Sequence, residues 1–190
     1  MSPMVTRIVI LVLVVMCSFG LYAAVDTLQA MPVKQAQEAA LSRFGAELLK
    51  LCQGATKTRD GTLPSAVRIA AINRSNSTVF DDYDAALPTN LKATDKSDVN
   101  VLLCLSEEKN VFNVDEYGKP VKYRCTQYTR DITAYLVDVQ TGKTLDYRTF
   151  DGQEPPECPD KTDTNLTRTG NLPPASDLNS WLTRRVKGNV

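Results

Sequence analysis

The most distinctive chemistry in this 190-residue chain lies in four of its five cysteines, those beyond the N-terminal apolar segment: Cys52, Cys104, Cys125 and Cys158. An even number of cysteines in an exported domain is typical of disulfides, here two bonds with three possible pairings. The separations of 52, 21 and 33 residues contain no C-x-x-C pair, and the sequence has no histidine. Both facts disfavour a zinc site and a thioredoxin-like redox centre.

The pairing prediction starts from a turn expected at Asp115–Gly118. A hairpin symmetric about that turn brings Cys104 near Cys125, and Cys52 is then left to join Cys158 across the chain. Closing so long a loop restricts the unfolded chain and stabilises the fold. The alternative is that Cys52 is a buried free thiol on the apolar side of a helix.

Carboxylates are the other candidates for chemistry. Asp81, Asp82 and Asp84 cluster, but calcium loops need a glycine turn and a distal glutamate at fixed spacing, which this segment lacks. Glu154 and Glu157 lie among prolines and have no predictable geometry as an acid–base pair. Because histidine is absent, Ser-His-Asp and Cys-His mechanisms are excluded. The sequence therefore predicts no catalytic, cofactor-binding or metal-ligating residue and no cofactor.

The overall charge excludes one class of partner. Twenty-two basic and twenty-two acidic residues cancel, and the pI is near 6.3. Nucleic-acid binding normally needs a basic surplus, so no nucleic-acid partner is expected. Recruitment to anionic lipid by charge alone is disfavoured for the same reason.

Residues 1–30 are expected to be a signal peptide or an N-terminal membrane anchor. Arg7 precedes eighteen uncharged residues, Ile8–Val25. A short apolar core followed by Ala23, Ala24 or Ala30 as cut points fits a signal peptide, whereas the run also just reaches spanning length. Either alternative places the rest of the chain outside the cytoplasm, secreted, periplasmic or tethered, with a membrane contact only if the segment is not cleaved.

The remaining chain predicts an α+β domain over residues 31–152, with a mixed α/β arrangement as the variant. Apolar residues at helical spacing predict a helix from Pro32 to Gly54. Apolar or mixed segments predict strands at 66–72, 99–105, 111–114, 121–128, 131–139 and 144–150. Gly142 supplies the positive φ for a turn at 140–143. Together these elements predict one twisted, largely antiparallel sheet of four or five strands, with the long helix on one face.

Two further segments follow. Residues 153–175 carry prolines and polar residues and are expected to form a loop without a core of its own. Residues 176–190 are expected to form a short helix, capped by Ser176, whose apolar stripe docks back onto the domain.

The segment from Tyr123 to Pro159 resembles a hairpin in exported bacterial proteins of unknown function. In them a strand, a Thr-Gly turn (here Thr141-Gly142) and a second strand lead to a Phe-x-Gly-x-x-Pro-x-x-Cys-Pro signature, here Phe150 to Pro159. The resemblance implies an envelope or extracellular domain and carries no catalytic residue.

The function expected from the sequence is a non-enzymatic, extracytoplasmic binding or accessory domain. It would act through its sheet edge or loops on an unknown protein or envelope component. One alternative is a carboxylate-dependent hydrolase of the cell envelope, which needs two acidic residues converging in a pocket. The other is an anchored subunit of a membrane complex.

Overall fold

A computed structural model describes residues 34–59 and 61–188. The expected signal peptide or anchor, residues 1–30, lies outside the described residues. Within the described part of the chain, no helix is both long and apolar enough to cross a bilayer.

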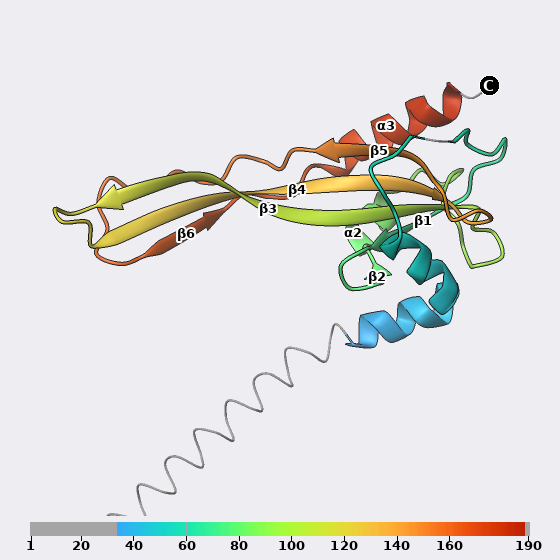
Figure 1. The fold of residues 1–190 in the computed structure, drawn as a ribbon, viewed down its shortest axis with the longest axis horizontal. Helices are drawn as coiled ribbons and strands as arrows, with labels where there is room; N and C mark the ends of the chain where they lie inside the picture. The colour runs from blue at the N-terminus through green and yellow to red at the C-terminus, as the bar shows by residue number, and fades with distance from the viewer. Residues whose placement is uncertain (1–33, 60, 189–190) are drawn as a thin grey trace, which may run out of the picture.

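The fold is α+β, as the sequence predicts, with a mixed sheet in the order β2-β1-β3-β4-β5 (Figure 1). A sixth strand, β6, pairs with β4 beside this path. The pairs β1–β3 and β4–β6 are parallel, and the other pairs are antiparallel. The elements are β1 Ile69–Asn73, β2 Thr78–Val79, α2 Asp81–Ala86, β3 Val101–Tyr117, β4 Tyr123–Asp138, β5 Thr144–Phe150, β6 Leu166–Thr169 and α3 Ala175–Lys187.

The centre of the sheet is buried on both faces, which explains why β1 and the start of β3 are continuous apolar runs. Val101, Leu103 and Leu105 belong to the core that also contains residues of α2 and α3. Leu102 and Cys104, which point to the opposite face, belong to a second core with the N-terminal helix. The sheet is therefore the middle layer between helices on both sides.

The N-terminal helix spans residues 34–53 and bends sharply at Gly45, whose φ is +78°. A residue other than glycine is strained at such a φ, so glycine suits the bend. Ala40 and Phe44 before the bend and Leu49 and Cys52 after it are all buried in the second core. The bend lets both halves of the helix cover the same sheet face.

The disulfides are Cys52–Cys104 and Cys125–Cys158, so the predicted pairing is wrong. In the β3–β4 register Cys104 lies opposite Tyr135 and Cys125 opposite Asp115, which separates the two cysteines by ten residues along the hairpin. Cys104 instead meets the helix that packs on its face, where Cys52 lies. Two intramolecular disulfides indicate an oxidising, extracytoplasmic environment.

The error in pairing comes from the position of the hairpin turn. Asp115, Glu116 and Tyr117, predicted as a turn, are paired residues of β3, and the turn lies at 118–121. The predicted short strands 99–105 and 111–114 merge into one strand of 17 residues, β3. Likewise 121–128 and 131–139 merge into β4, which has 16 residues.

The C-terminal helix docks on the domain as expected, with Leu178, Trp181 and Leu182 buried in the first core. The ring of Trp181 packs edge-on against Phe150 at 5.8 Å between centroids. The helix begins at Ala175 after Pro174, and Ser176 lies inside its first turn, so the expected Ser176 cap is wrong. Proline suits this N-cap position because the backbone N–H of a residue at the start of a helix forms no intrahelical hydrogen bond, so its absence in Pro174 costs none.

Candidate interaction arm

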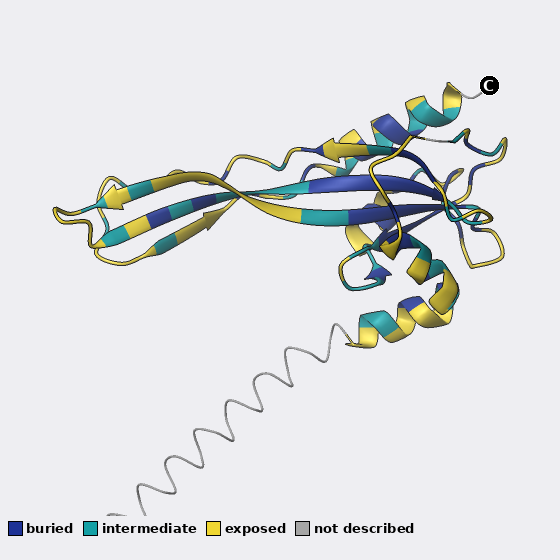
Figure 2. Ribbon diagram, in the orientation of Figure 1, coloured by how far each residue is buried: buried dark blue, intermediate teal, exposed yellow. Residues whose placement is uncertain are grey.

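The outer halves of β3 and β4, residues 107–130, project from the domain as a long hairpin, here called the arm (Figure 1). Little of the arm is buried, whereas the inner halves of the same strands are (Figure 2). Of the five large hydrophobic side chains that are exposed in the described part of the chain, four lie on the arm: Val111 (62 %), Phe112 (51 %), Val114 (42 %) and Val121 (47 %). Such a concentration of exposed apolar side chains is typical of an interaction surface.

The segment after β5 is bonded to both strands of the arm. Cys158 is bonded to Cys125, the Gln127 amide donates to the Pro156 carbonyl at 2.9 Å, and the Tyr117 hydroxyl donates to the Pro159 carbonyl at 2.6 Å. The chain then returns as β6 and pairs with β4. This strand lies within 153–175, which was expected to be a loop; its main-chain bonds come from β4 and need no core of its own.

On the edge of the arm away from β6, the strand β3 has an open edge. β3 pairs with β1 only over Val101–Leu105, so beyond Leu105 it has β4 on one side and no strand on the other among the described residues. A bulge in β3 between Val111 and Asn113 leaves Phe112 without a partner residue on β4. Open edges with exposed apolar side chains are templates for pairing with another strand.

The root of the arm is fixed to the body by polar contacts. Nε and Nη2 of Arg130 donate to the two carboxylate oxygens of Glu107 at 2.6 and 3.1 Å, a two-pronged pair across β3 and β4. The backbone of Gly152 lies so close to Arg130 that a Cβ would come within 2.4 Å of its carbonyl oxygen. The glycine of the Phe-x-Gly sequence is thus required where the tail crosses the arm.

Tyr83 of α2, beside this root, is buried, and its hydroxyl donates to the Pro173 carbonyl at 2.7 Å. Burial, assisted by the negative charge of Asp82, raises its pKa from 10.0 to about 12. Because the unfolded chain loses this proton first, Tyr83 stabilises the fold fully below pH 10, and this contribution is lost as the pH rises toward 12.

We expect Tyr83→Phe to remove that pH dependence. Urea denaturation of wild type and variant should therefore give a stability difference that is constant below pH 10 and shrinks between pH 10 and about 12. A difference that stays constant over the whole alkaline range would show that Tyr83 ionises equally in both states. Tyr123→Phe, a half-buried tyrosine of the arm, is the control.

A polar groove of about 460 Å³ lies between β5 and α3. It contains two carboxylates, Asp151 and Asp177, together with the guanidinium groups of Arg148 and Arg184. Both carboxylates are exposed. A general acid at neutral pH needs an apolar enclosure that raises its pKa, so this groove does not provide the environment that carboxylate catalysis requires.

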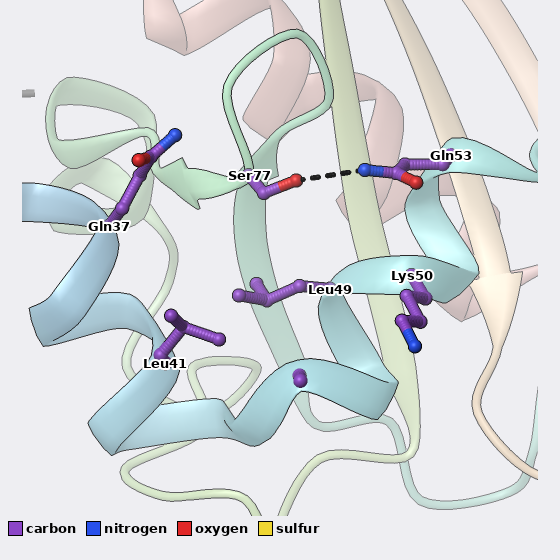
Figure 3. Close-up of a pocket in the computed structure, with 7 residues that line it drawn as sticks. Gln37, Leu41, Leu49, Lys50, Gln53 and Ser77 are labelled. Carbon is purple, nitrogen blue, oxygen red and sulfur yellow. Dashed lines mark hydrogen bonds between the residues drawn. The ribbon is translucent and has the colours of Figure 1, made fainter. Parts of the chain in front are cut away.

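A second hollow, of about 250 Å³, lies on the inner side of the bent N-terminal helix, beside the turn between β1 and β2 (Figure 3). The Gln53 amide donates to the Ser77 hydroxyl at 3.3 Å across its edge. Its other lining residues among those the structure describes are mostly apolar or uncharged, together with one lysine: Gln37, Leu41, Ala46, Leu49 and Lys50. Among the described lining residues, Ser77 has no histidine or carboxylate beside it that could act as a general base.

The residues considered from the sequence are dispersed. Asp84 is buried and ion-paired, whereas Asp81 and Asp82 are exposed on α2. Glu154 and Glu157 belong to the tail that braces the arm. All four candidate cysteines are in disulfides, and no three acidic or cysteine side chains of residues 34–59 and 61–188 gather as a metal site.

Comparison with protein-family models, with curated proteins and with solved structures gives no match.

The arm itself was not predicted from the sequence. Its residues alternate poorly between apolar and polar because neither of its faces packs against a helix, so they were divided into short strands and a turn. One feature of the sequence does indicate the arm. Val111, Phe112 and Val114 lie in a strongly polar segment, where apolar side chains have no apolar surroundings in which to be buried.

Proposed function

We propose that this protein is a non-enzymatic, extracytoplasmic binding or accessory domain whose binding element is the arm. The observation that supports this proposal most is the open edge of β3 beyond Leu105, which carries exposed Val111, Phe112 and Val114. A strand that adds to such an edge gains main-chain hydrogen bonds, while side-chain contacts select the partner.

The contacts that hold the tail and β6 on the arm support the same proposal. A disulfide at Cys125 and hydrogen bonds from Gln127 of β4 and Tyr117 of β3 hold the tail on the arm, and β6 pairs with β4 on the edge away from the open edge. An ordered strand loses less conformational entropy on binding than a flexible loop. The contacts that order the arm therefore favour the binding of a partner at the open edge of β3. The resemblance of the Phe150–Pro159 segment to exported bacterial proteins agrees with a place in the envelope.

The alternative hydrolase has weaker support. Asp151 and Asp177 do line one groove, but both are exposed. The alternative of an anchored subunit of a membrane complex is compatible with a binding arm and differs from the first proposal only in residues 1–30.

Photo-crosslinking in the native host tests the proposal. A photoreactive amino acid in place of Phe112 should yield a discrete crosslinked product, because this exposed side chain lies on the proposed binding surface. The same amino acid in place of Lys143, exposed in the β4–β5 turn at the other end of β4, is the control and should yield none. Equal crosslinking at both positions, or none at Phe112, contradicts the proposal.

A further inference from the structure

The hydrogen-bonding direction of the open edge follows from β4. Even-numbered residues of β4 direct their backbone groups toward β6, since Tyr128 accepts from the Gly170 N–H at 2.9 Å and the Arg124 N–H donates to the Asn165 side chain at 2.9 Å. Residues directly opposite one another in an antiparallel pair both point inward or both point outward. The β3 residues opposite even-numbered β4 residues therefore direct their backbone groups to the open edge.

Four residues of β3 meet this condition. Lys109 and Val111 lie before the bulge, opposite Arg130 and Tyr128; Val114 and Glu116 lie after it, opposite Thr126 and Arg124. Side chains two residues apart on a strand share a face, so the four β4 residues all lie on one face of the arm. The four β3 residues directly opposite them therefore lie on that same face. The bulge makes this pattern possible, because it shifts the outward-facing set from odd to even numbers.

From this pattern we propose that the partner at the open edge is a second copy of this chain, paired antiparallel through β3. A two-fold axis between Phe112 and Asn113 places Lys109 opposite Glu116 of the second copy and Val111 opposite its Val114. Each of these pairs occurs twice. The outward-facing backbone groups of both strands then meet, and Phe112 of each copy lies beside the axis. This inference rests on the proposed function of the arm and names its partner.

Charge selects this register over its neighbours. In the proposed register both Lys109 side chains face Glu116, which within its own chain also pairs with Arg124 at 3.0 Å, while the Lys109 ammonium lies over the Tyr128 ring at 4.1 Å. Both side chains are exposed at the edge, and opposite charges across strands are stabilising. A shift by one hydrogen-bonded step places Glu107 opposite Glu116, which is a repulsive pair. A shift the other way leaves Lys109 beyond the last paired residue. The three exposed apolar side chains of each copy, at Val111, Phe112 and Val114, gather at the centre only in the proposed register.

Charge exchange tests the pairing in solution. Sedimentation of the exported protein, purified from its host over a range of concentrations, should show a dimer. Lys109→Glu should raise the dimer dissociation constant roughly tenfold, because two attractive pairs become repulsive. Glu116→Lys should do the same, and the double exchange K109E/E116K should restore dimerisation. Restoration by the double variant also shows that the single variants did not fail by misfolding.

Disulfide trapping tests the register. The double variant V111C/V114C should form a covalent dimer, since opposed residues in an antiparallel pair lie about 5.5 Å apart at Cα, within the reach of a disulfide. Within one chain the same positions are about 10 Å apart, which is too far. K109C/V111C is the matched control: neither position faces itself or the other in the proposed register, so this variant should form no covalent dimer on non-reducing gels.

A monomer at all concentrations, or a dimer that is indifferent to K109E, overturns self-pairing. The crosslink at Phe112 separates this failure from failure of the proposed function. A product of twice the chain mass supports the second copy. A product of any other mass overturns self-pairing and leaves the binding role of the arm intact, whereas no product contradicts both.

Discussion

Replacing Cys52 and Cys104 together by alanine is expected to lower the free energy of unfolding by about 4 kcal/mol. This disulfide closes a segment of 52 residues, and its absence restores freedom mainly to the unfolded chain. Both cysteines are completely buried, so the variant also loses packing between the N-terminal helix and β3. Denaturation with urea under non-reducing conditions measures the change.

Removal of the other disulfide is the matched control. Cys125 and Cys158 close a shorter segment, of 33 residues, and hold the tail on the arm. We expect C125A/C158A to expose the 153–165 segment to proteolysis while the packing between the N-terminal helix and β3 is retained. If C52A/C104A unfolds at the same urea concentration as the wild type, the bond does not hold the N-terminal helix in the fold.

Asp84→Ala is expected to lower the free energy of unfolding by about 2–3 kcal/mol, because it removes a buried carboxylate that bonds two partly exposed cations and a backbone N–H. The Asp84 side chain is only 5 % exposed and lies 3.1 Å from the Lys92 ammonium and 3.4 Å from the Arg43 guanidinium. It also accepts from the Ala71 N–H of β1 at 3.4 Å. Without the carboxylate, the two half-buried cations and this N–H lose their common partner.

Asp82→Ala is the control for that change. It removes a carboxylate from the same helix, but Asp82 is exposed and has no ion pair among the described residues. We expect a change within about 0.5 kcal/mol. Thermal and urea unfolding of both variants measure the two changes. An equal loss in the free energy of unfolding at positions 82 and 84 would mean that the ion pairs of Asp84 contribute nothing beyond the effect of a negative charge on the helix.

The sequence predicted the fold where packing leaves a pattern. Val101–Leu105 and the helix around Phe44 were recognisable because burial on one or two faces imposes a hydrophobic period. The turn at 140–143 was recognisable because Gly142 has a φ of +68°, which confirms the prediction. These signals are local, and local signals are those that a single sequence carries.

The parts that were missed depend on register and on long-range pairing. The disulfide pairing failed because Cys104 was expected near Cys125, whereas the hairpin turn at 118–121 places Cys104 opposite Tyr135, ten residues further along β4. β6 was missed because it pairs with β4 only through the main chain, and Leu166–Thr169 contributes no buried hydrophobic side chain to either core. The open edge of the arm was missed for a related reason. Whether a strand edge is unpaired depends on which strands lie next to it in the sheet, and a single sequence does not show this.

Because β3 and β4 run without interruption from the core into the arm, the arm projects from the body in a fixed direction and to a fixed length. The arm has no linker at its root, so its direction is set by strands that are themselves locked between two helical layers. From Leu105 to Tyr117 the strand covers about 40 Å. A partner bound at the tip would therefore be kept at a constant distance from the body, and a force on the tip would be transmitted through continuous strands to the centre of the sheet.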